Sequence, residues 1–216
     1  MFRIITIERE YGCGGGAIAK KLAQQLGWNL WDRRITEEIA AMANVDCSAV
    51  ERRGEKLDSR FYRLAKTFWR GSYERAIPLD ERQTFDADCM VSMMETISAK
   101  IAAEGKAVVV GRGAPFFLRD RPDTFHVFLY APRAEKIRRI MAEGDGDSQA
   151  AEELVDTVDS ERKAFIRHYF NSDWPTRALY HMMINTVVGD EYVIATIRES
   201  MLRLEHALPV SVRGIR

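Results

Sequence analysis

The chain of 216 residues has no net charge, because its 32 lysines and arginines are balanced by 32 aspartates and glutamates. A chain without an excess of one sign has no overall field that would draw it to nucleic acid or to an anionic membrane surface. We therefore expect neither as a partner. Any phosphate-binding site must come from a local arrangement of cations.

Cysteines and long apolar runs are scarce as well. Cys13, Cys47 and Cys89 lie far apart and form no CxxC pattern, and an odd, sparse set of cysteines is typical of a reducing compartment. No window approaches the roughly 18 apolar residues that a membrane helix needs. The N-terminal apolar run is too short for a signal peptide and meets an acidic residue at Glu8. These absences favour a cytoplasmic protein.

The length of the chain suits one sizeable domain, residues 1–216, rather than two. Short apolar runs alternate with segments of helical spacing, which predicts an α/β three-layer sandwich around a five-stranded parallel sheet. The predicted strands are residues 2–8, 28–31, 107–110, 124–131 and 180–187. The predicted helices are residues 17–26, 33–43, 47–65, 86–103, a helix from Pro132 to Met141, 150–170 and 192–206, with a turn at 144–147.

A glycine-rich loop separates the first predicted strand from the first predicted helix. Gly12, Gly14, Gly15 and Gly16 surround Cys13 there. Glycine lets the backbone approach a ligand closely and adopt positive φ, and the N–H groups at a helix start attract anions. The loop therefore predicts a phosphate site, and a turn that merely packs helix against sheet is the less favoured alternative.

The loop departs from the Walker A pattern GxxxxGK[ST], in which the lysine reaches the β- and γ-phosphates and the hydroxyl binds magnesium. The lysine position falls on Gly15, and Gly16 and Ala17 follow. A dinucleotide-binding loop is a weaker alternative. Its acidic residue would be Asp32, which two arginines follow.

Together with its flanking residues, this loop resembles the cytidylate kinase-like family of P-loop proteins. The segments that carry the resemblance are ITIEREYG, IAKKLAQQLG, WNLWDRR, VVVGRGAPFFLRDRPDTFHVFLYAPRAEKIRRI, DSERKAFIRHYFNSDW and MMINT, in this order. They extend over nearly the whole chain, and residues 44–104 contribute least.

The resemblance implies a nucleoside-monophosphate-kinase fold with a helical acceptor region at residues 33–105 and a lid-like segment at 144–175. It also implies transfer of the γ-phosphoryl group of ATP, with Mg²⁺, to a nucleoside monophosphate such as CMP or to another small acceptor. Cytidylate kinases carry the loop lysine and an aspartate where this chain has Gly15 and Val110, and looser relatives often have an arginine at the position of Gly16. A catalytically inactive nucleotide-binding regulatory module therefore stands as the alternative.

The resemblance assigns roles residue by residue, and it assigns no metal ligand. Arg112 corresponds to an arginine that binds the acceptor phosphate, and Arg162 and Arg167 lie on the lid helix. These two arginines are five residues apart and therefore about 140° apart on a helix, so both face one ligand only if the helix ends or bends between them. The nucleotide phosphates are expected at Arg9, Tyr11, Gly12, Cys13, Gly14, Gly15, Gly16 and Ala17, and the acceptor at Asp32 and Arg33.

Two further features carry expectations. A helix N-terminus lowers the pKa of a thiol, which would open Cys13 to oxidation, although a filling role in the loop is the favoured interpretation. An aromatic run is expected to form core or an interface, which leaves room for a homodimer; it consists of Phe61, Tyr62, Phe68, Trp69 and Tyr73.

Overall fold

The computed structural model describes residues 1–46, 87–143 and 147–207. The predicted helix at 47–65, the aromatic run and most of the turn at 144–147 lie outside these residues. The division into an acceptor region at 33–105 and a lid-like segment at 144–175 stays a prediction.

Five parallel strands form one sheet in the order β2-β3-β1-β4-β5. They are β1 (Ile4–Arg9), β2 (Asn29–Trp31), β3 (Ala107–Val110), β4 (Thr124–Tyr130) and β5 (Met182–Asn185). Strand β1 lies in the centre, so the loop that follows it opens at the middle of the sheet's carboxyl edge. In the dinucleotide-binding fold the second strand is next to the first, whereas β3 separates them here, which disfavours the dinucleotide alternative.

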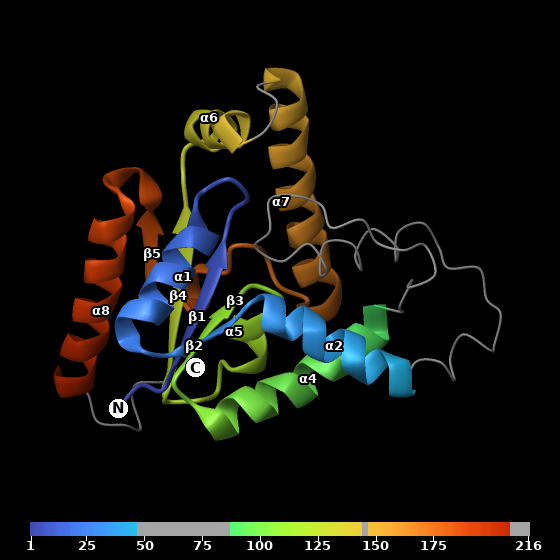
Figure 1. The fold of residues 1–216 in the computed structure, drawn as a ribbon, viewed down its shortest axis with the longest axis vertical. Coiled ribbons are helices and arrows are strands. Elements are labelled where there is room, and N and C mark those ends of the chain that lie inside the picture. Colours follow the sequence, from blue (N-terminus) through green and yellow to red (C-terminus); the bar gives the residue numbers. More distant parts are fainter. Residues whose placement is uncertain (47–86, 144–146, 208–216) are drawn as a thin grey trace.

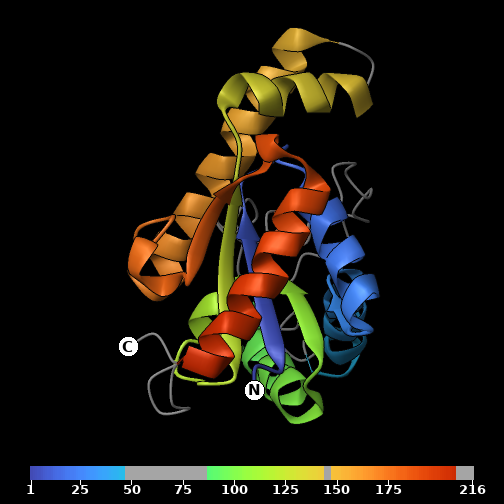
Figure 2. The same ribbon diagram turned by 90° about the vertical axis from the view of Figure 1, so that its left-hand side faces the viewer.

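Helices cover both faces of the sheet, so the predicted three-layer α/β architecture is confirmed (Figures 1 and 2). One face packs against α1 (Gly15–Leu26) and α8 (Asp190–Ala207). The other packs against α4 (Ala87–Glu104), α5 (Ala114–Phe117) and α7 (Ser148–Phe170), and α2 (Arg33–Asp46) lies on α4. The remaining helix is α6 (Arg133–Glu143).

The two cores follow from the alternation of side chains along the strands. In β1, Ile5 and Ile7 enter the core under α1 and α8, and Ile4 enters the opposite core. Because both faces are covered, the central strands are buried throughout. Such strands appear in the sequence as continuous apolar runs, as expected for a parallel sheet.

The last strand is shorter than predicted. Strand β5 covers four residues, between 3₁₀ turns at Arg177–Leu179 and Thr186–Val188. It is an edge strand whose residues are half-buried. The side chain of Asn185 accepts a hydrogen bond from the Val187 N–H (3.2 Å), which starts the second turn. This local bond competes with strand extension.

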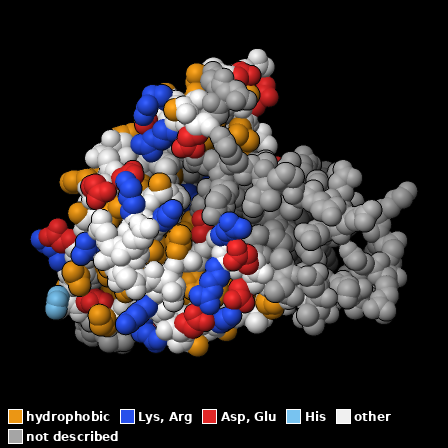
Figure 3. All heavy atoms as spheres, viewed as in Figure 1, with side chains coloured by type: hydrophobic (Ala, Val, Ile, Leu, Met, Phe, Trp, Pro, Cys, Tyr) orange, Lys and Arg blue, Asp and Glu red, His pale blue; other side chains and the backbone are white. Residues whose placement is uncertain are grey.

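No helix in the described ranges is long and apolar enough to cross a membrane. On the face drawn in Figure 3, basic and acidic side chains are interspersed rather than gathered by sign. The expectations of a cytoplasmic location and of no nucleic-acid partner stay predictions.

Candidate functional site

The glycine loop joins the carboxyl end of β1 to α1, as predicted. Its Gly12 and Gly14 have φ of +74° and +78°, and Gly14 is the N-cap of α1 without a capping side chain. The helix begins at Gly15, two residues earlier than predicted. Gly15, Gly16 and Ala17 therefore form its first turn, whose N–H groups have no partner within the helix. With no acidic residue in that turn, the loop is suited to an anion.

Helix α6 lies against the loop and explains two of its glycines (Figure 1). A Cβ on Gly12 would meet the Lys136 carbonyl oxygen at 3.0 Å, and one on Gly14 would meet Nη1 of Arg139 at the same distance. The Arg139 guanidinium donates to the Cys13 carbonyl (2.5 Å) and to the Thr186 hydroxyl (3.0 Å). The loop is thus held from outside by α6 and by the turn after β5.

Three arginines lie together beside the loop. Arg9 ends β1, Arg112 follows β3 with a left-handed φ of +57°, and Arg162 comes from α7. Nη1 of Arg162 donates to the Arg9 carbonyl at 2.8 Å. Burial lowers the pKa of the Arg112 guanidinium, and burial together with the charge of Arg9 lowers that of Arg162 to about 10. These shifts show positive charges gathered away from water.

Arg112 and Asp32, both predicted as site residues, form a buried ion pair at the carboxyl edge of the sheet. Nη1 of Arg112 lies 3.2 Å from Oδ1 of Asp32, with side chains 3% and 10% exposed. Asp32 follows β2 and Arg112 follows β3, which are neighbours in the sheet. The adjacent Arg33 points elsewhere, because its exposed guanidinium pairs with Glu37 one helical turn later (2.9 Å).

The two arginines of α7 are separated, as their spacing indicates. The side chain of Arg162 is 11% exposed and contacts Asp159 (3.5 Å). That of Arg167 is 63% exposed and pairs with Asp173 (3.0 Å). Helix α7 continues to Phe170, so it does not end between them. Arg162 therefore lies in the candidate site, and Arg167 lies outside it.

Asp159 links three elements around the loop. Its Oδ1 accepts from the Tyr11 N–H (2.7 Å), and its Oδ2 accepts from Nζ of Lys136 (2.9 Å). Lys136 also donates to Oε2 of Glu10 (3.0 Å). Beneath these contacts, Tyr11 packs with apolar residues of α6 and α7. One carboxylate thus ties the loop, α6 and α7 together.

Sequence reasoning missed Glu8, Lys136, Arg139 and Asp159. The signal for Glu8 was present, since it is a carboxylate inside a strand predicted to be buried, and it is 3% exposed. Lys136 and Arg139, and likewise Asp159 and Arg162, are three residues apart and so share a helix face. Their meeting with the loop depends on tertiary packing. Among the described residues, no group of three or more His, Cys, Asp or Glu is arranged to hold a metal ion.

The expectation of a low thiol pKa at Cys13 is wrong. The residue is fully buried and its Sγ lies 3.6 Å from the Leu129 carbonyl oxygen. Burial raises the pKa of the thiol to about 11. The cost of placing a thiolate in this core exceeds the help of the helix N-terminus, so Cys13 fills the base of the loop.

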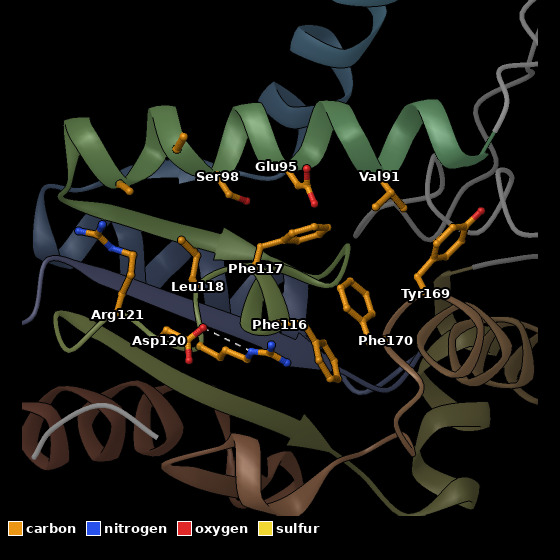
Figure 4. Close-up of a pocket in the computed structure, with 13 residues that line it drawn as sticks. Val91, Glu95, Ser98, Phe116, Phe117, Leu118, Asp120, Arg121, Tyr169 and Phe170 are labelled. Carbon is orange, nitrogen blue, oxygen red and sulfur yellow. Dashed lines mark ion pairs between the residues drawn. The ribbon is translucent and has the colours of Figure 1, made fainter. Parts of the chain in front are cut away.

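A groove of about 550 Å³ lies between α4, α5 and the end of α7 (Figure 4). Its aromatic side includes Phe116 and Phe170, which stack with ring centroids 4.4 Å apart. A Cβ on Gly113 would lie 2.8 Å from the Phe170 ring. The turn that carries Arg112 therefore packs directly against a wall of this groove.

Glu8 predicts an unusual pH dependence of stability. Burial raises its pKa above the ordinary 4.5 despite the nearby Arg9 and Arg162. The folded protein then binds more protons than the unfolded chain above pH 4.5, so stability falls as pH rises through the folded pKa. We expect Glu8→Gln to flatten this fall, and to raise the melting temperature at pH 8 relative to the parent protein, in thermal unfolding followed by circular dichroism at pH 5 and pH 8.

Glu135 supplies a control of opposite sign. Hydrogen bonds from Arg138, together with those from Arg139, lower the pKa of its carboxyl to about 2. The stability that Glu135 contributes is fully present above pH 4.5 and is lost as pH falls toward the folded pKa of about 2. Glu135→Gln should therefore lower the melting temperature at pH 8. A Glu8→Gln protein that melts lower than the parent at pH 8 would show that Glu8 is stabilised by its arginines more than burial destabilises it.

The comparisons with known proteins concern the family and the fold of the chain. The sequence profile of the cytidylate kinase-like family matches residues 4–187. An uncharacterised protein from Eubacterium ventriosum shares the fold with a TM-score of 0.66 and 21% identity, over 93% of this chain and 98% of its own. Shikimate kinase from Acinetobacter baumannii, solved in complex with shikimate, has a TM-score of 0.50 and 14% identity over 97% of each chain.

The search of curated proteins found no match. Likeness at these identities shows the fold alone, and shikimate kinase shares it. The family profile covers most of the chain, including the loop, β3 with Arg112, and α7. The chain therefore belongs to the cytidylate kinase-like family.

Proposed function

We propose that this protein transfers the γ-phosphoryl group of ATP to a small acceptor, with a nucleoside monophosphate such as CMP as the first candidate. One observation carries the proposal: Arg9, Arg112 and Arg162 lie together beside the glycine loop at the carboxyl edge of the central strand. Phosphoryl transfer asks a protein mainly to position the reactants and to neutralise charge on the transferred group. Loop and arginines are suited to these two tasks.

The roles follow from position. The N–H groups of residues 12–17 would hold the nucleotide phosphates, and Arg112, oriented by Asp32, would hold the acceptor phosphate. Arg162 would neutralise the group in transit. An acceptor phosphate oxygen forms a bond to the γ-phosphorus while the bond from that phosphorus to ADP breaks. Arg33 and Arg167 were predicted as members of the site, but their exposed ion pairs support no role in this step.

Magnesium is the implied cofactor of this reaction. When bound, it would neutralise negative charge on the nucleotide phosphates during the transfer. The ion prefers oxygen ligands and combines one or two carboxylates with water and substrate phosphates. Asp32 fits this requirement, because its carboxylate lies at the carboxyl edge of the sheet beside Arg112.

An inactive nucleotide-binding module remains the second candidate function. The observation in its favour is that two of the arginines are already bonded within the protein. Arg112 pairs with Asp32, and Arg162 donates to the Arg9 carbonyl and pairs with Asp159. Such cations can hold the fold together without taking part in turnover. This candidate predicts ATP binding without consumption of ATP.

We would test turnover by ³¹P NMR with magnesium-ATP and a pool of nucleoside monophosphates. The parent protein should produce the diphosphate of one acceptor without a matching rise in inorganic phosphate. Gly14→Asp should abolish this signal, because it places a carboxylate at the positive end of α1. Gly27→Asp is the matched control. Gly27 also has a positive φ, of 63°, and it caps the far end of the same helix with open space around it.

The outcomes separate the two candidates. Turnover in the parent and Gly27→Asp proteins, together with its loss in Gly14→Asp, supports the kinase. Bound but unchanged ATP in the parent protein supports the regulatory module.

A further inference from the structure

Gly15 stands where the Walker A pattern has its lysine, and the side chain of Arg9 fills the space next to it. A Cβ built on Gly15 would lie 3.0 Å from both Cβ and Cγ of Arg9. Contacts this short are rare for real side chains, so the stem of Arg9 fills the space in which a side chain at position 15 would begin. In the Walker A pattern, position 9 is the first glycine and position 15 is the lysine. This chain has exchanged the long cationic side chain and the glycine between these two positions.

The guanidinium of Arg9 lies at the end of β3. A Cβ on Gly111 would be 2.0 Å from its Nη1. The side chain therefore extends from the end of β1 across the backbone of Gly111, next to the turn that carries Arg112. It is 5% exposed, and Oε1 of Glu8 lies 3.9 Å from Nη1. A larger residue at position 15 or at position 111 would displace it.

Three arginines and three carboxylates share the surroundings of this guanidinium: Arg112 pairs with Asp32, Arg162 contacts Asp159, and Arg9 lies near Glu8. The positive charge of Arg9 lowers the pKa of both Arg112 and Arg162, after the larger effect of burial. Placing like charges together in a buried site is costly. Phosphate groups would offset that cost, and charge-assisted hydrogen bonds to phosphate are among the strongest that side chains make.

We propose that Arg9 supplies to the nucleotide phosphates the positive charge that the loop lysine supplies in other P-loop proteins, and that Gly15 and Gly111 are glycines because Arg9 passes over them. This inference rests on the proposed function, since it assumes that the loop binds ATP. In this proposal the cation comes from the end of β1, before the loop, whereas the Walker A lysine comes from the start of α1, after the loop.

Four variants test this inference: Arg9→Met, Gly15→Lys, Arg9→Gly/Gly15→Lys and, as a control, Lys20→Met. Arg9→Met keeps most of the stem and removes the charge, so it should fold and bind ATP roughly 10–100-fold more weakly by calorimetry. Gly15→Lys alone should melt several degrees lower than the parent, because its side chain meets the stem of Arg9. Lys20→Met removes a cation from an exposed position of α1 and should leave both readouts unchanged.

The double variant is the decisive protein. Arg9→Gly/Gly15→Lys restores the Walker arrangement, so it should regain the melting temperature lost in Gly15→Lys and bind ATP within about tenfold of the parent. The proposal for Arg9 is overturned if Arg9→Met binds ATP as tightly as the parent. It is also overturned if Gly15→Lys lowers the melting temperature as much in the double variant as it does alone. Binding of ATP without turnover in the parent would count against the kinase alone. Failure of the parent to bind either ATP or inorganic tripolyphosphate would overturn both proposals.

Discussion

We expect the Arg112→Met protein to transfer phosphoryl groups about a thousandfold more slowly than the parent, since arginines that neutralise a transferring phosphoryl group contribute 10³–10⁵ in kcat. Arg112 is the cation that the β3 turn places beside the loop, and Asp32 orients it. Methionine retains much of the stem and loses the charge and the donors. The measurement is the steady-state rate with saturating magnesium-ATP and with the acceptor identified by ³¹P NMR.

Loss of folding has to be separated from loss of catalysis in this experiment. Arg112→Met takes from Asp32, which is 7% exposed, the guanidinium with which it pairs, and breaking a buried pair costs about 3–5 kcal/mol. The Arg112→Met/Asp32→Asn protein removes both charges and should recover most of that stability. If the double variant is stable and still slow, Arg112 acts on the reaction. If the Arg112→Met/Asp32→Asn protein instead reacts at nearly the parental rate, the ion pair stabilises the fold and Arg112 does not act on the reaction.

The second large effect is expected at Arg162. Arg162→Met removes the hydrogen bond to the Arg9 carbonyl, the ion pair with Asp159 and one of the three clustered positive charges. Removing one preorganised donor to a transition state costs about 10²–10³ in kcat. We expect a loss of that size in kcat, measured in the same assay.

Arg167→Met is the matched control for Arg162→Met, because it makes the same change five residues further along α7. Arg167 forms an exposed pair with Asp173, and exposed pairs contribute little to stability. It should keep the parental rate within about twofold, which is the range of an exposed pair worth a few tenths of a kcal/mol. Equal losses at both positions would mean that the effect comes from α7 as a whole, and would count against a direct role for Arg162.

Much of the fold was predictable from the sequence because local patterns carry it. The buried runs at β1, β3 and β4 and the glycines at the start of α1 have strong signals, and the ends of all five strands were placed within about two residues. The spacing of Arg162 and Arg167 correctly indicated that they face different sides of α7. The largest error in length is at β5, which was predicted at residues 180–187 and covers Met182–Asn185; it is a half-buried edge strand with a weak apolar signal.

The assembly of the site was less predictable, because it depends on contacts between distant parts of the chain. Asp159 and Tyr11 are 148 residues apart, and no local sequence pattern predicts the hydrogen bond between them. The error at Cys13 has a different origin. The rule for helix N-termini holds for exposed thiols, whereas the desolvation of this buried thiol dominates its pKa. Arg9 was expected at the phosphates, but its path over Gly15 and Gly111 depends on the pairing of β1 with β3, which no local pattern specifies.

The carboxylate of Asp159 has a mechanical consequence. It accepts the Tyr11 N–H at the start of the glycine loop and, through its other oxygen, the ammonium of Lys136 on α6. Any motion that lifts α7 away therefore breaks a bond to the loop backbone and a bond to α6 in the same step. The position of the loop backbone and the positions of α6 and α7 are therefore coupled through one side chain.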